Sequence, residues 1–527
     1  MSGHHDVIII GSGPAGVSAA FPLLDAGLKV LMIDGGQQAT ASVPSQSFMQ
    51  WRENDPEQWK TMVGQDFHAL RQADAASPKL RVPTHAHVFA GFAQGNDVHS
   101  QNFMAIGSLA TGGLSNAWGC GVATFQGQDL HDFPFASQDL QPSYEVIGRR
   151  IGISGQTDDE LSSYFGVDAW AQAPTEMDEL HRCILSRHQR IKRSNQDSDF
   201  KMGRPRLAVL TQDLADRKAC DLSGNCMWGC AGSSLYSATQ DLASLKRRAG
   251  FEHKPGLVAG HITRHPDGHL MVHTRDKHGP QTLQGHRVFL AAGTLASSRL
   301  AMRALGLSTI TQMQSCPTAA FMLWSPKHLG RPRSPTFGLG QLSFTLGLTA
   351  GINGFGSLFN PATIPLAEFV RHVPLGKRLG IDFMAALVTS CSVGNVFLPG
   401  TLSKTRLSLD ETGALKVEGH LDSSVATLMN QARERLASVF LKRGALMLPG
   451  SFKIGLPGSD IHHACSLPMR HRPERGETTP LGELAGFDGV HAIDGASLSY
   501  LPEKSHTMTI MANADRIARI VAVNLNR

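Results

Sequence analysis

Val7-Ile-Ile-Ile-Gly11-Ser-Gly13-Pro-Ala-Gly16, followed after a helical stretch by Lys29-Val-Leu-Met-Ile-Asp34, is the part of the sequence that decides the fold. It predicts a buried strand, a glycine turn, an alanine-rich helix and a second buried strand. Gly11 permits the turn, Gly13 lets the backbone approach a pyrophosphate, and Gly16 allows close packing of helix on strand. The stretch therefore predicts a Rossmann βαβ unit that binds a dinucleotide.

Three further features bear on this unit. Asp34 follows the glycines by about 20 residues and is placed to accept a hydrogen bond from a ribose hydroxyl. Pro22 lies inside the expected helix and should kink or shorten it, because proline has no N–H to donate. The segment Arg287-Val-Phe-Leu-Ala-Ala-Gly293 predicts a strand, a turn and a helix that return beside the first unit. The chain holds one such fingerprint, whereas a flavin reductase that uses a pyridine nucleotide usually needs two.

Composition indicates a large globular α/β protein. The chain has 527 residues, 41% hydrophobic and 18% charged, so we expect two interleaved domains able to enclose a cofactor. The net charge of +5 and the lack of long basic runs argue against a nucleic-acid partner. No apolar segment approaches the roughly 20 residues that cross a bilayer. Because Met1–Asp6 leave no room for a secretion signal, we expect a cytoplasmic protein.

The stretch Gly107-Ser-Leu-Ala-Thr-Gly112-Gly113-Leu-Ser115-Asn116-Ala117-Trp118-Gly-Cys120 introduces a family resemblance. It resembles the loop that wraps the flavin and its pyrophosphate in the glucose-methanol-choline (GMC) oxidoreductases, and most of all the pyranose-oxidase type of that loop. In that type a histidine holds the flavin covalently. The matching position here is Ala117, so the resemblance implies FAD bound without a covalent link.

Two C-terminal segments extend the resemblance. His462-His463-Ala-Cys465-Ser466-Leu-Pro-Met469 is similar to the family pattern of histidine, two residues, Gly-Thr or Gly-Ser, two residues and methionine. His462 takes the place of the first active-site histidine, Cys465 replaces the glycine, and His463 leaves a one-residue alternative. After Asp494-Gly495, the loop before the final helix places His506 where the family has histidine or asparagine. The resemblance thus implies His462 and His506 as catalytic residues.

A histidine pair suits the oxidation of an alcohol. A hydride leaves carbon more easily if the hydroxyl proton departs with it, and histidine, with a pKa of about 6.5, can accept that proton near working pH. We expect His462 to accept the proton, His506 to hydrogen-bond the same oxygen, and flavin N5 to take the hydride. Which histidine is the base is left open.

The predicted FAD site combines the glycine turn, the end of the second strand, the flavin loop and the later segments. Its residues are Gly11, Gly13, Pro14, Ala15, Gly16, Asp34, Gly35, Gly112, Gly113, Ser115, Asn116, Ala117, Trp118, Val258, Ala292, Gly293, Asp494, Gly495, His506, Thr507 and Met508.

Three of the eight cysteines, Cys220, Cys226 and Cys230, lie within 11 residues. Clustered thiolates favour a soft metal or an iron-sulfur cluster. The spacing resembles that of GMC dehydrogenases whose catalytic subunit carries a three-iron cluster, which implies such a cluster here. Structural thiols, zinc and a disulfide are the other interpretations. We expect Cys183 and Cys316, with Cys391, to be buried thiols.

The predicted fold class is α/β, with a Rossmann-type FAD-binding domain interleaved with an α+β substrate domain. The FAD-binding domain is expected from residues 1–125, 205–308 and 485–527, and the substrate-binding domain from 126–204 and 309–484. Within the latter, three stretches (338–356, 406–410 and 415–418) predict an antiparallel sheet that faces the flavin. Residues 423–441 predict an amphipathic helix.

The predicted function is FAD-dependent oxidation of an alcohol (CH–OH) group on a sugar or polyol-like compound. The electron acceptor is oxygen or a protein or quinone, so oxidase and dehydrogenase both stay open. One alternative is a non-redox lyase on the same flavin fold. Another is an FAD and iron-sulfur dehydrogenase subunit that passes electrons to a cytochrome partner.

Overall fold

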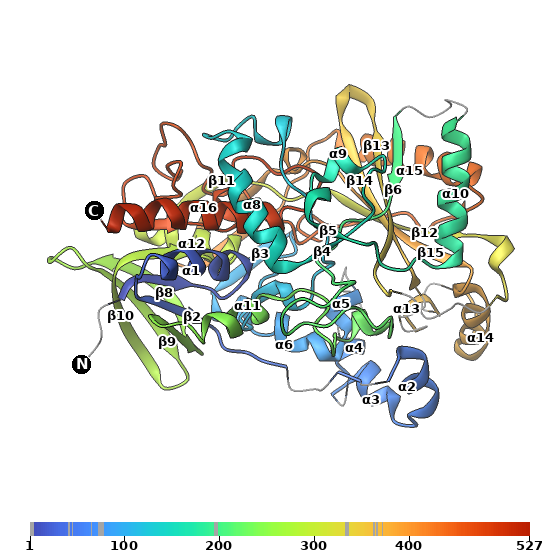
Figure 1. Ribbon diagram of the computed structural model, residues 1–527, viewed down its shortest axis with the longest axis horizontal. Helices are drawn as coiled ribbons and strands as arrows, with labels where there is room; N and C mark the ends of the chain where they lie inside the picture. The colour runs from blue at the N-terminus through green and yellow to red at the C-terminus, as the bar shows by residue number, and fades with distance from the viewer. Residues whose placement is uncertain are drawn as a thin grey trace.

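The computed structural model describes residues 5–39, 43–44, 46–64, 66–71, 78–193, 199–331, 337–361, 364, 367–370 and 373–526 (Figure 1). Residues 1–4 lie outside this part. They belong to Met1–Asp6, the segment that we expect to hold no secretion signal. Within the described part, no helix is both long enough and apolar enough to cross a membrane.

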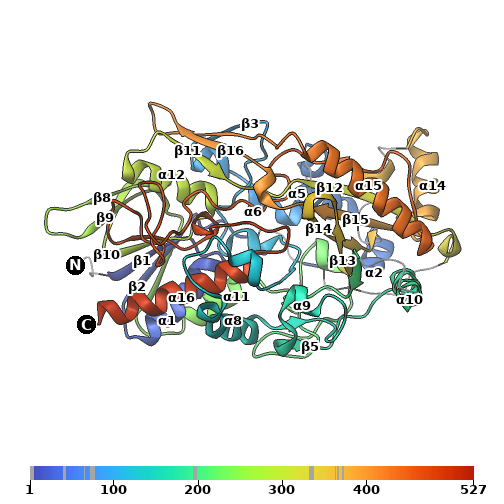
Figure 2. The ribbon, with the colours of Figure 1, turned by 90° about the horizontal axis from the view of Figure 1, so that it is seen from above.

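A seven-stranded sheet occupies the end of the molecule where both termini lie (Figures 1 and 2). The strand order is β7-β2-β1-β10-β9-β8, and β20 also pairs with β10. Pairing is parallel from β7 through β10 and at β20, and antiparallel between β10, β9 and β8. The strands are β1 (His5–Ile10), β2 (Val30–Asp34), β7 (Phe251–Pro255), β8 (Val258–Arg264), β9 (Leu270–Asp276), β10 (Gly279–Leu290) and β20 (Val490–Ala492).

Helices cover both faces of this sheet. Successive strand residues point to opposite faces, so alternate side chains of one strand pack in two different cores. Val7 and Ile9 pack in the same core as α1 (Pro14–Asp25), α11 (Ala238–Leu245) and α16 (Thr507–Leu525). Ile8 and Ile10 pack in the core that contains α12 (Thr294–Leu305). The predicted βαβ unit and the returning strand-turn-helix are therefore confirmed. Helix α1 continues past Pro22 to Asp25, so the proline lies near the end of the helix without ending it.

A second seven-stranded sheet, antiparallel throughout, forms the middle of the opposite part of the molecule (Figure 2). Its order is β18-β12-β15-β14-β13-β6, and β19 pairs with β12. The strands are β6 (Phe200–Gly203), β12 (Thr318–Trp324), β13 (Gly340–Gly347), β14 (Asn353–Phe359), β15 (Cys391–Phe397), β18 (Leu446–Met447) and β19 (Lys453–Ile454).

The two faces of this antiparallel sheet differ. Leu342, Phe344 and other large side chains pack against α10 (Glu179–Arg193) and α15 (Val425–Lys442). Ser343 lies between Leu342 and Phe344 and therefore points to the opposite face of the sheet. Ser343 and Ser357 line a cavity on that face. The predicted amphipathic helix at residues 423–441 is confirmed as α15.

The hairpin predicted to belong to the same antiparallel sheet lies elsewhere. Strands β16 (Thr405–Leu409) and β17 (Leu415–Glu418) form a four-stranded sheet with β11 (Thr309–Met313) and β3 (Val98–Gln101) in the order β11-β16-β17-β3. Their apolar side chains, including Leu407 and Leu415, pack in the core beneath the first sheet. The prediction of one sheet was wrong, because alternation marks a strand but does not select its neighbour. The domain boundaries stay a prediction.

The remaining elements are shorter or lie at the periphery. They are α2 (Phe48–Asn54), α3 (Gln58–Val63), α4 (His68–Arg71), α5 (Pro78–Arg81), α6 (Ala86–Phe89), α7 (Phe92–Gly95), α8 (Ser137–Ile151), α9 (Ser162–Phe165), α13 (Ala367–Val370), α14 (Lys377–Val388), β4 (Ile153–Ser154) and β5 (Ala171–Gln172).

Candidate active site

The glycine turn between β1 and α1 has the geometry that its sequence predicts. Gly11 has a φ of +114°, and a Cβ there would lie 2.2 Å from the carbonyl oxygen of Ala291. Gly13 is the N-cap of α1, and a Cβ there would meet no atom within 4 Å. Gly13 also lines the cavity. A ligand can therefore approach the backbone at the N-terminus of α1.

Asp34 lies at the end of β2, in the wall of the same cavity. Its carboxylate accepts hydrogen bonds from the hydroxyl of Ser12 and, at 2.8 Å, from the backbone N–H of Gly36. His253 Nε2 lies 3.0 Å from its Oδ2. The side chain is held in one orientation beside the glycine turn, while its bond to a ribose stays a prediction.

The predicted flavin loop folds back onto the glycine turn. The backbone N–H of Gly112 donates to Ser12 Oγ at 3.0 Å, and a Cβ on Gly113 would lie 3.4 Å from the Cα of Gly13. Trp118 Nε1 donates to the carbonyl of Tyr236 at 2.7 Å, which anchors the far end of the loop. The loop therefore lies against the N-terminus of α1, with Ala117 in the cavity wall.

The returning strand and the C-terminal segment meet at Asp494, just after β20. Asp494 Oδ2 accepts from the backbone N–H of Gly293 at 2.8 Å and from Ser297 Oγ at 2.6 Å. Its Oδ1 accepts from the N–H of Ala496 at 3.0 Å. Burial raises the pKa of this carboxyl to about 6. Asp494 thus joins the turn after β10 to the C-terminal loop.

One cavity of about 830 Å³ collects these segments. Of the residues predicted to bind FAD, it is lined by Gly11, Gly13, Pro14, Ala15, Asp34, Gly35, Gly113, Ser115, Ala117, Trp118, Val258, Ala292, Gly293, Asp494, Gly495, His506 and Thr507. Gly16, Gly112, Asn116 and Met508 do not line it. Gly16 instead packs on the turn, where a Cβ would lie 2.0 Å from the carbonyl oxygen of Gly11.

The two predicted catalytic histidines meet in this cavity. The ring centroids of His462 and His506 lie 4.8 Å apart, at an interplanar angle of 74°. Both residues line the cavity, although 44 positions separate them in the chain. His506 is the N-cap of α16, and His462 packs against Phe397 at 5.2 Å between ring centroids. Among the described residues, the buried Nδ1 of each histidine has no hydrogen-bond partner.

Burial keeps both imidazoles neutral. It lowers the pKa of His462 to about 4 and that of His506 well below the usual value, because a buried imidazolium loses its hydration. A positive charge on His462 would further lower the pKa of His506, and one on His463 would further lower the pKa of His462. The alternative residue, His463, also lines the cavity, but its Nε2 lies 3.1 Å from the carbonyl of Gly458. His462 is therefore the ring that faces His506.

Asp460 is a residue of the site that the sequence analysis missed. Its Oδ2 lies 4.0 Å from His462 Nδ1 and accepts from the backbone N–H of Cys316 at 2.6 Å. Burial raises its pKa to about 8, so the carboxyl is protonated at neutral pH. Only one residue separates Asp460 from His462, and this spacing could have drawn attention to Asp460. Its hydrogen-bond partner Cys316 is remote in sequence and could not have been predicted.

Cys465, at the position where the GMC pattern has glycine, has a φ of +64°. A non-glycine residue seldom adopts this left-handed conformation, which glycine reaches without strain. The backbone at this position therefore keeps the shape that a glycine would have, and the Cys465 N–H donates to the carbonyl of Gly495 at 2.9 Å.

The cysteine cluster gains no support as a metal site. Among the described residues, Cys220, Cys226 and Cys230 are not a group whose ligand atoms lie within 4.8 Å of one another. All three are free thiols, and burial raises the pKa of Cys220 and of Cys226 above the usual thiol range. Cys220 and Cys226 therefore stay protonated, as structural cysteines do. Cys316 and Cys391 are buried as predicted, whereas Cys183 is half-buried.

Comparisons with known proteins agree with this architecture. A family model described as pyridine nucleotide-disulphide oxidoreductase matches residues 5–102. No curated protein sequence matches the chain. A solved structure of pyridoxine 4-oxidase from Mesorbium loti has 14% sequence identity and a TM-score of 0.61, covering 98% of this chain and 99% of that one.

A second solved structure extends the agreement over the full length. A variant of formate oxidase from Aspergillus oryzae, described for its FAD modification, has 10% identity and a TM-score of 0.64, covering 100% of this chain and 99% of that one. At these identities the likeness concerns the fold. The chain therefore has the fold of these two oxidases, and the predicted Rossmann-type α/β fold class is confirmed.

Proposed function

We propose that this protein is an FAD-dependent oxidoreductase that oxidises an alcohol group. The observation that carries the proposal is the meeting of His462 and His506, 4.8 Å apart between ring centroids, in the cavity that the Rossmann glycine turn also lines. A nucleotide-binding turn and a pair of neutral bases in one cavity are the two parts that such a reaction needs.

The residues present fit FAD. A Cβ on Gly13 or on Gly293 would meet no atom within 4 Å, so the backbone leaves room at both turns that line the cavity. The buried Nδ1 atom of His506 is a polar group that a substrate or cofactor can satisfy. When bound, FAD would supply the hydride acceptor. The methyl group of Ala117 offers no atom for a covalent link, so we propose that FAD binds non-covalently.

The chain's own residues would handle the hydroxyl proton. His462, neutral above a pH of about 4, would accept the proton from the substrate oxygen. His506 would hydrogen-bond the same oxygen and orient it. Asp460, 4.0 Å from His462 Nδ1, would act as a positioning residue on the far side of that ring. Removing these groups from water strengthens each of these interactions.

The antiparallel sheet supports a hydroxyl-bearing substrate. Its cavity face carries Ser343, Ser357 and Asn395 beside the apolar Phe355 and Phe359. Hydroxyl and amide groups in such a wall suit a sugar or a polyol-like compound, since each can donate and accept hydrogen bonds. Both similar structures are named oxidases, which favours oxygen over a protein or quinone as the electron acceptor.

The proposal predicts that an alcohol bleaches the purified yellow protein. We expect anaerobic addition of a substrate from a panel of sugars, polyols and simple alcohols to remove the flavin absorbance, and admission of oxygen to restore it. Absorbance spectroscopy under argon provides the measurement. A protein that keeps its flavin band with every compound, while cleaving one of them, would be the non-redox lyase and not an oxidoreductase.

The pH dependence of flavin reduction should show two transitions. Below a pH of about 4 the rate should fall, because His462 becomes protonated and can no longer accept a proton. Through a pH of about 8 the rate should rise about tenfold, because Asp460 ionises and its negative charge favours the imidazolium that forms on His462. Stopped-flow reduction from about pH 3 to about pH 9 measures both.

Asp460→Asn separates a positioning role from a structural one. Its side-chain oxygen can still accept from the N–H of Cys316, but the side chain cannot ionise. We expect the rise near pH 8 to disappear while the acid transition at His462 stays. If the variant keeps the alkaline rise, Asp460 does not act on His462.

A further inference from the structure

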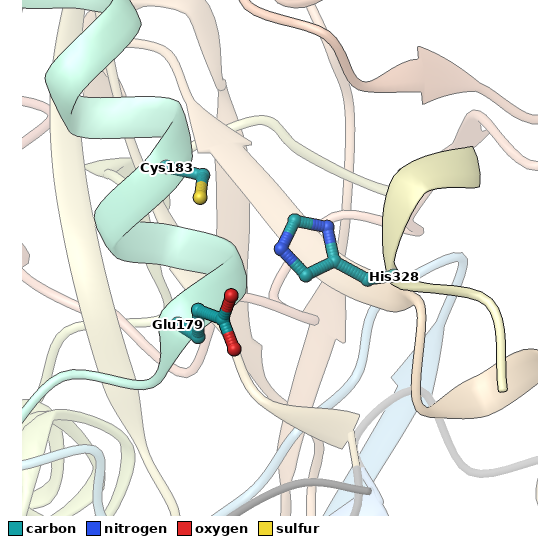
Figure 3. A group of neighbouring side chains, drawn as sticks. All are labelled: Glu179, Cys183 and His328. Atoms are coloured by element: carbon teal, nitrogen blue, oxygen red, sulfur yellow. The ribbon is translucent and has the colours of Figure 1, made fainter. Parts of the chain in front are cut away.

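We propose that Glu179, Cys183 and His328 form a binding site for a divalent cation of the zinc class. One ligand atom from each residue lies within 4.8 Å of the others. Figure 3 shows the carboxylate, the thiol and the imidazole pointing toward one another, two of them from α10 and the third from the loop that follows β12. None of the three lines the cavity, so this site is separate from the proposed catalytic centre.

The helix places two of the ligands. Glu179 and Cys183 are four residues apart in α10, and residues at this spacing lie on the same face of a helix. Glu179 is exposed and Cys183 is half-buried, so a cation can reach the site from solvent while the thiol is partly withdrawn from it. His328 closes the group from the end of a short 3₁₀ turn, Pro326–His328.

The surroundings of His328 orient its imidazole. Ser325 Oγ donates to the carbonyl of Gly444 at 3.2 Å and lies 3.0 Å from His328 Nδ1. A hydroxyl has one proton to give, so when Ser325 donates to Gly444 its oxygen accepts from Nδ1–H. The Nε2 then carries the lone pair, and Figure 3 shows this nitrogen turned toward Glu179 and Cys183. A hydrogen bond that fixes the tautomer of a metal-binding histidine is typical of zinc sites.

Arg331 competes for the Glu179 carboxylate. Arg331 Nη1 lies 3.1 Å from Glu179 Oε1, and both side chains are about 60% exposed. An ion pair at such a surface contributes little free energy, so the guanidinium can be displaced when a cation binds. The carboxylate is thus available to a dication despite this contact.

The donor set selects the kind of metal. Thiolate, imidazole and carboxylate together suit zinc, with water as a fourth ligand, whereas magnesium and calcium take oxygen ligands. Cys183 would lose its proton on binding, so affinity should fall as the pH is lowered. A bound ion would tie α10 to the loop after β12 on the side of the sheet away from the cavity, which would stabilise the fold without entering the reaction.

A second group needs to be distinguished in any test. Cys316, Asp460 and His462 also bring their ligand atoms within 4.8 Å of one another. A cation there would occupy the proposed base, and we expect this group to serve catalysis. Cys316→Ser removes the thiol of that group and leaves Cys183 intact, so it is the matched control for Cys183→Ser.

The experiment uses the full-length, FAD-loaded protein after treatment with a chelator. Titration with zinc, in competition with a chromophoric chelator, should show one tight equivalent, weakened at least about tenfold in Cys183→Ser and in Glu179→Gln but not in Cys316→Ser. Cobalt(II) should give a thiolate charge-transfer band, recorded as a difference spectrum against the metal-free flavoprotein, that Cys183→Ser abolishes. Flavin reduction by substrate should be unchanged in Cys183→Ser.

Two results would overturn the site. Cobalt binding without a thiolate band, at equal affinity in the wild type and in Cys183→Ser, would mean adventitious binding to some of the 24 histidines only. Loss of the band in Cys316→Ser instead would place the cation at His462. Because Glu179 is exposed, Glu179→Gln provides a folded variant if Cys183→Ser proves unstable.

Discussion

Replacing His506 by alanine should slow reduction of the flavin by an alcohol substrate by about 10²–10³-fold, the usual contribution of a hydrogen-bond donor that stabilises charge on the reacting oxygen. The variant should keep its FAD, because the cavity wall at the glycine turn and the flavin loop does not depend on this side chain. Anaerobic stopped-flow reduction gives the rate, and the flavin-to-protein absorbance ratio gives the FAD content.

Two companion variants sharpen this prediction. His506→Asn keeps a hydrogen-bond donor at a position where the family has histidine or asparagine, so it should recover part of the lost rate. His463→Ala removes the neighbouring ring, whose Nε2 is already occupied by the carbonyl of Gly458, and should reduce the rate far less than His462→Ala. Equal rates in His506→Ala and in the wild type would remove the histidine pair from the mechanism.

The parts of the fold that sequence predicted are those with a strong local signal. The apolar run that starts at Val7 and the one that ends at Leu290 are both buried strands. The glycines between elements mark turns that other residues could not adopt. The helix at residues 423–441 was equally visible from its spacing. Each of these depends on neighbours in the chain, so a short window of sequence contains the information.

The parts that sequence could not predict depend on contacts between distant segments. The hairpin of β16 and β17 pairs with β3 through Leu415 and Val98, and nothing local to either strand selects that partner. Asp460 accepts a hydrogen bond from the distant Cys316, and His328 lies beside a helix that begins at Glu179. The histidine pair was found because the family motif supplied the long-range information that local patterns lack.

Gly13→Val should weaken FAD binding strongly while leaving the fold intact. A Cβ at this position would meet no protein atom within 4 Å, so the apoprotein has space for the side chain. Gly13 lines the cavity at the N-terminus of α1, where we expect the pyrophosphate. Overpacking by a few methyl groups costs about 1–3 kcal/mol, or roughly 5–150-fold in affinity. Titration of apoprotein with FAD, followed by flavin fluorescence, measures the loss.

Gly376 provides a matched control for this substitution. It is also a helix N-cap with a negative φ, and a Cβ there would meet no atom within 4 Å, but it does not line the cavity. Gly13→Val and Gly376→Val should therefore lose similar amounts of thermal stability as apoproteins, because valine is a poorer N-cap than glycine. Only Gly13→Val should lose affinity for FAD. If both variants bind FAD as the wild type does, the pyrophosphate does not lie at the N-terminus of α1, and the nucleotide site must be assigned elsewhere in the cavity.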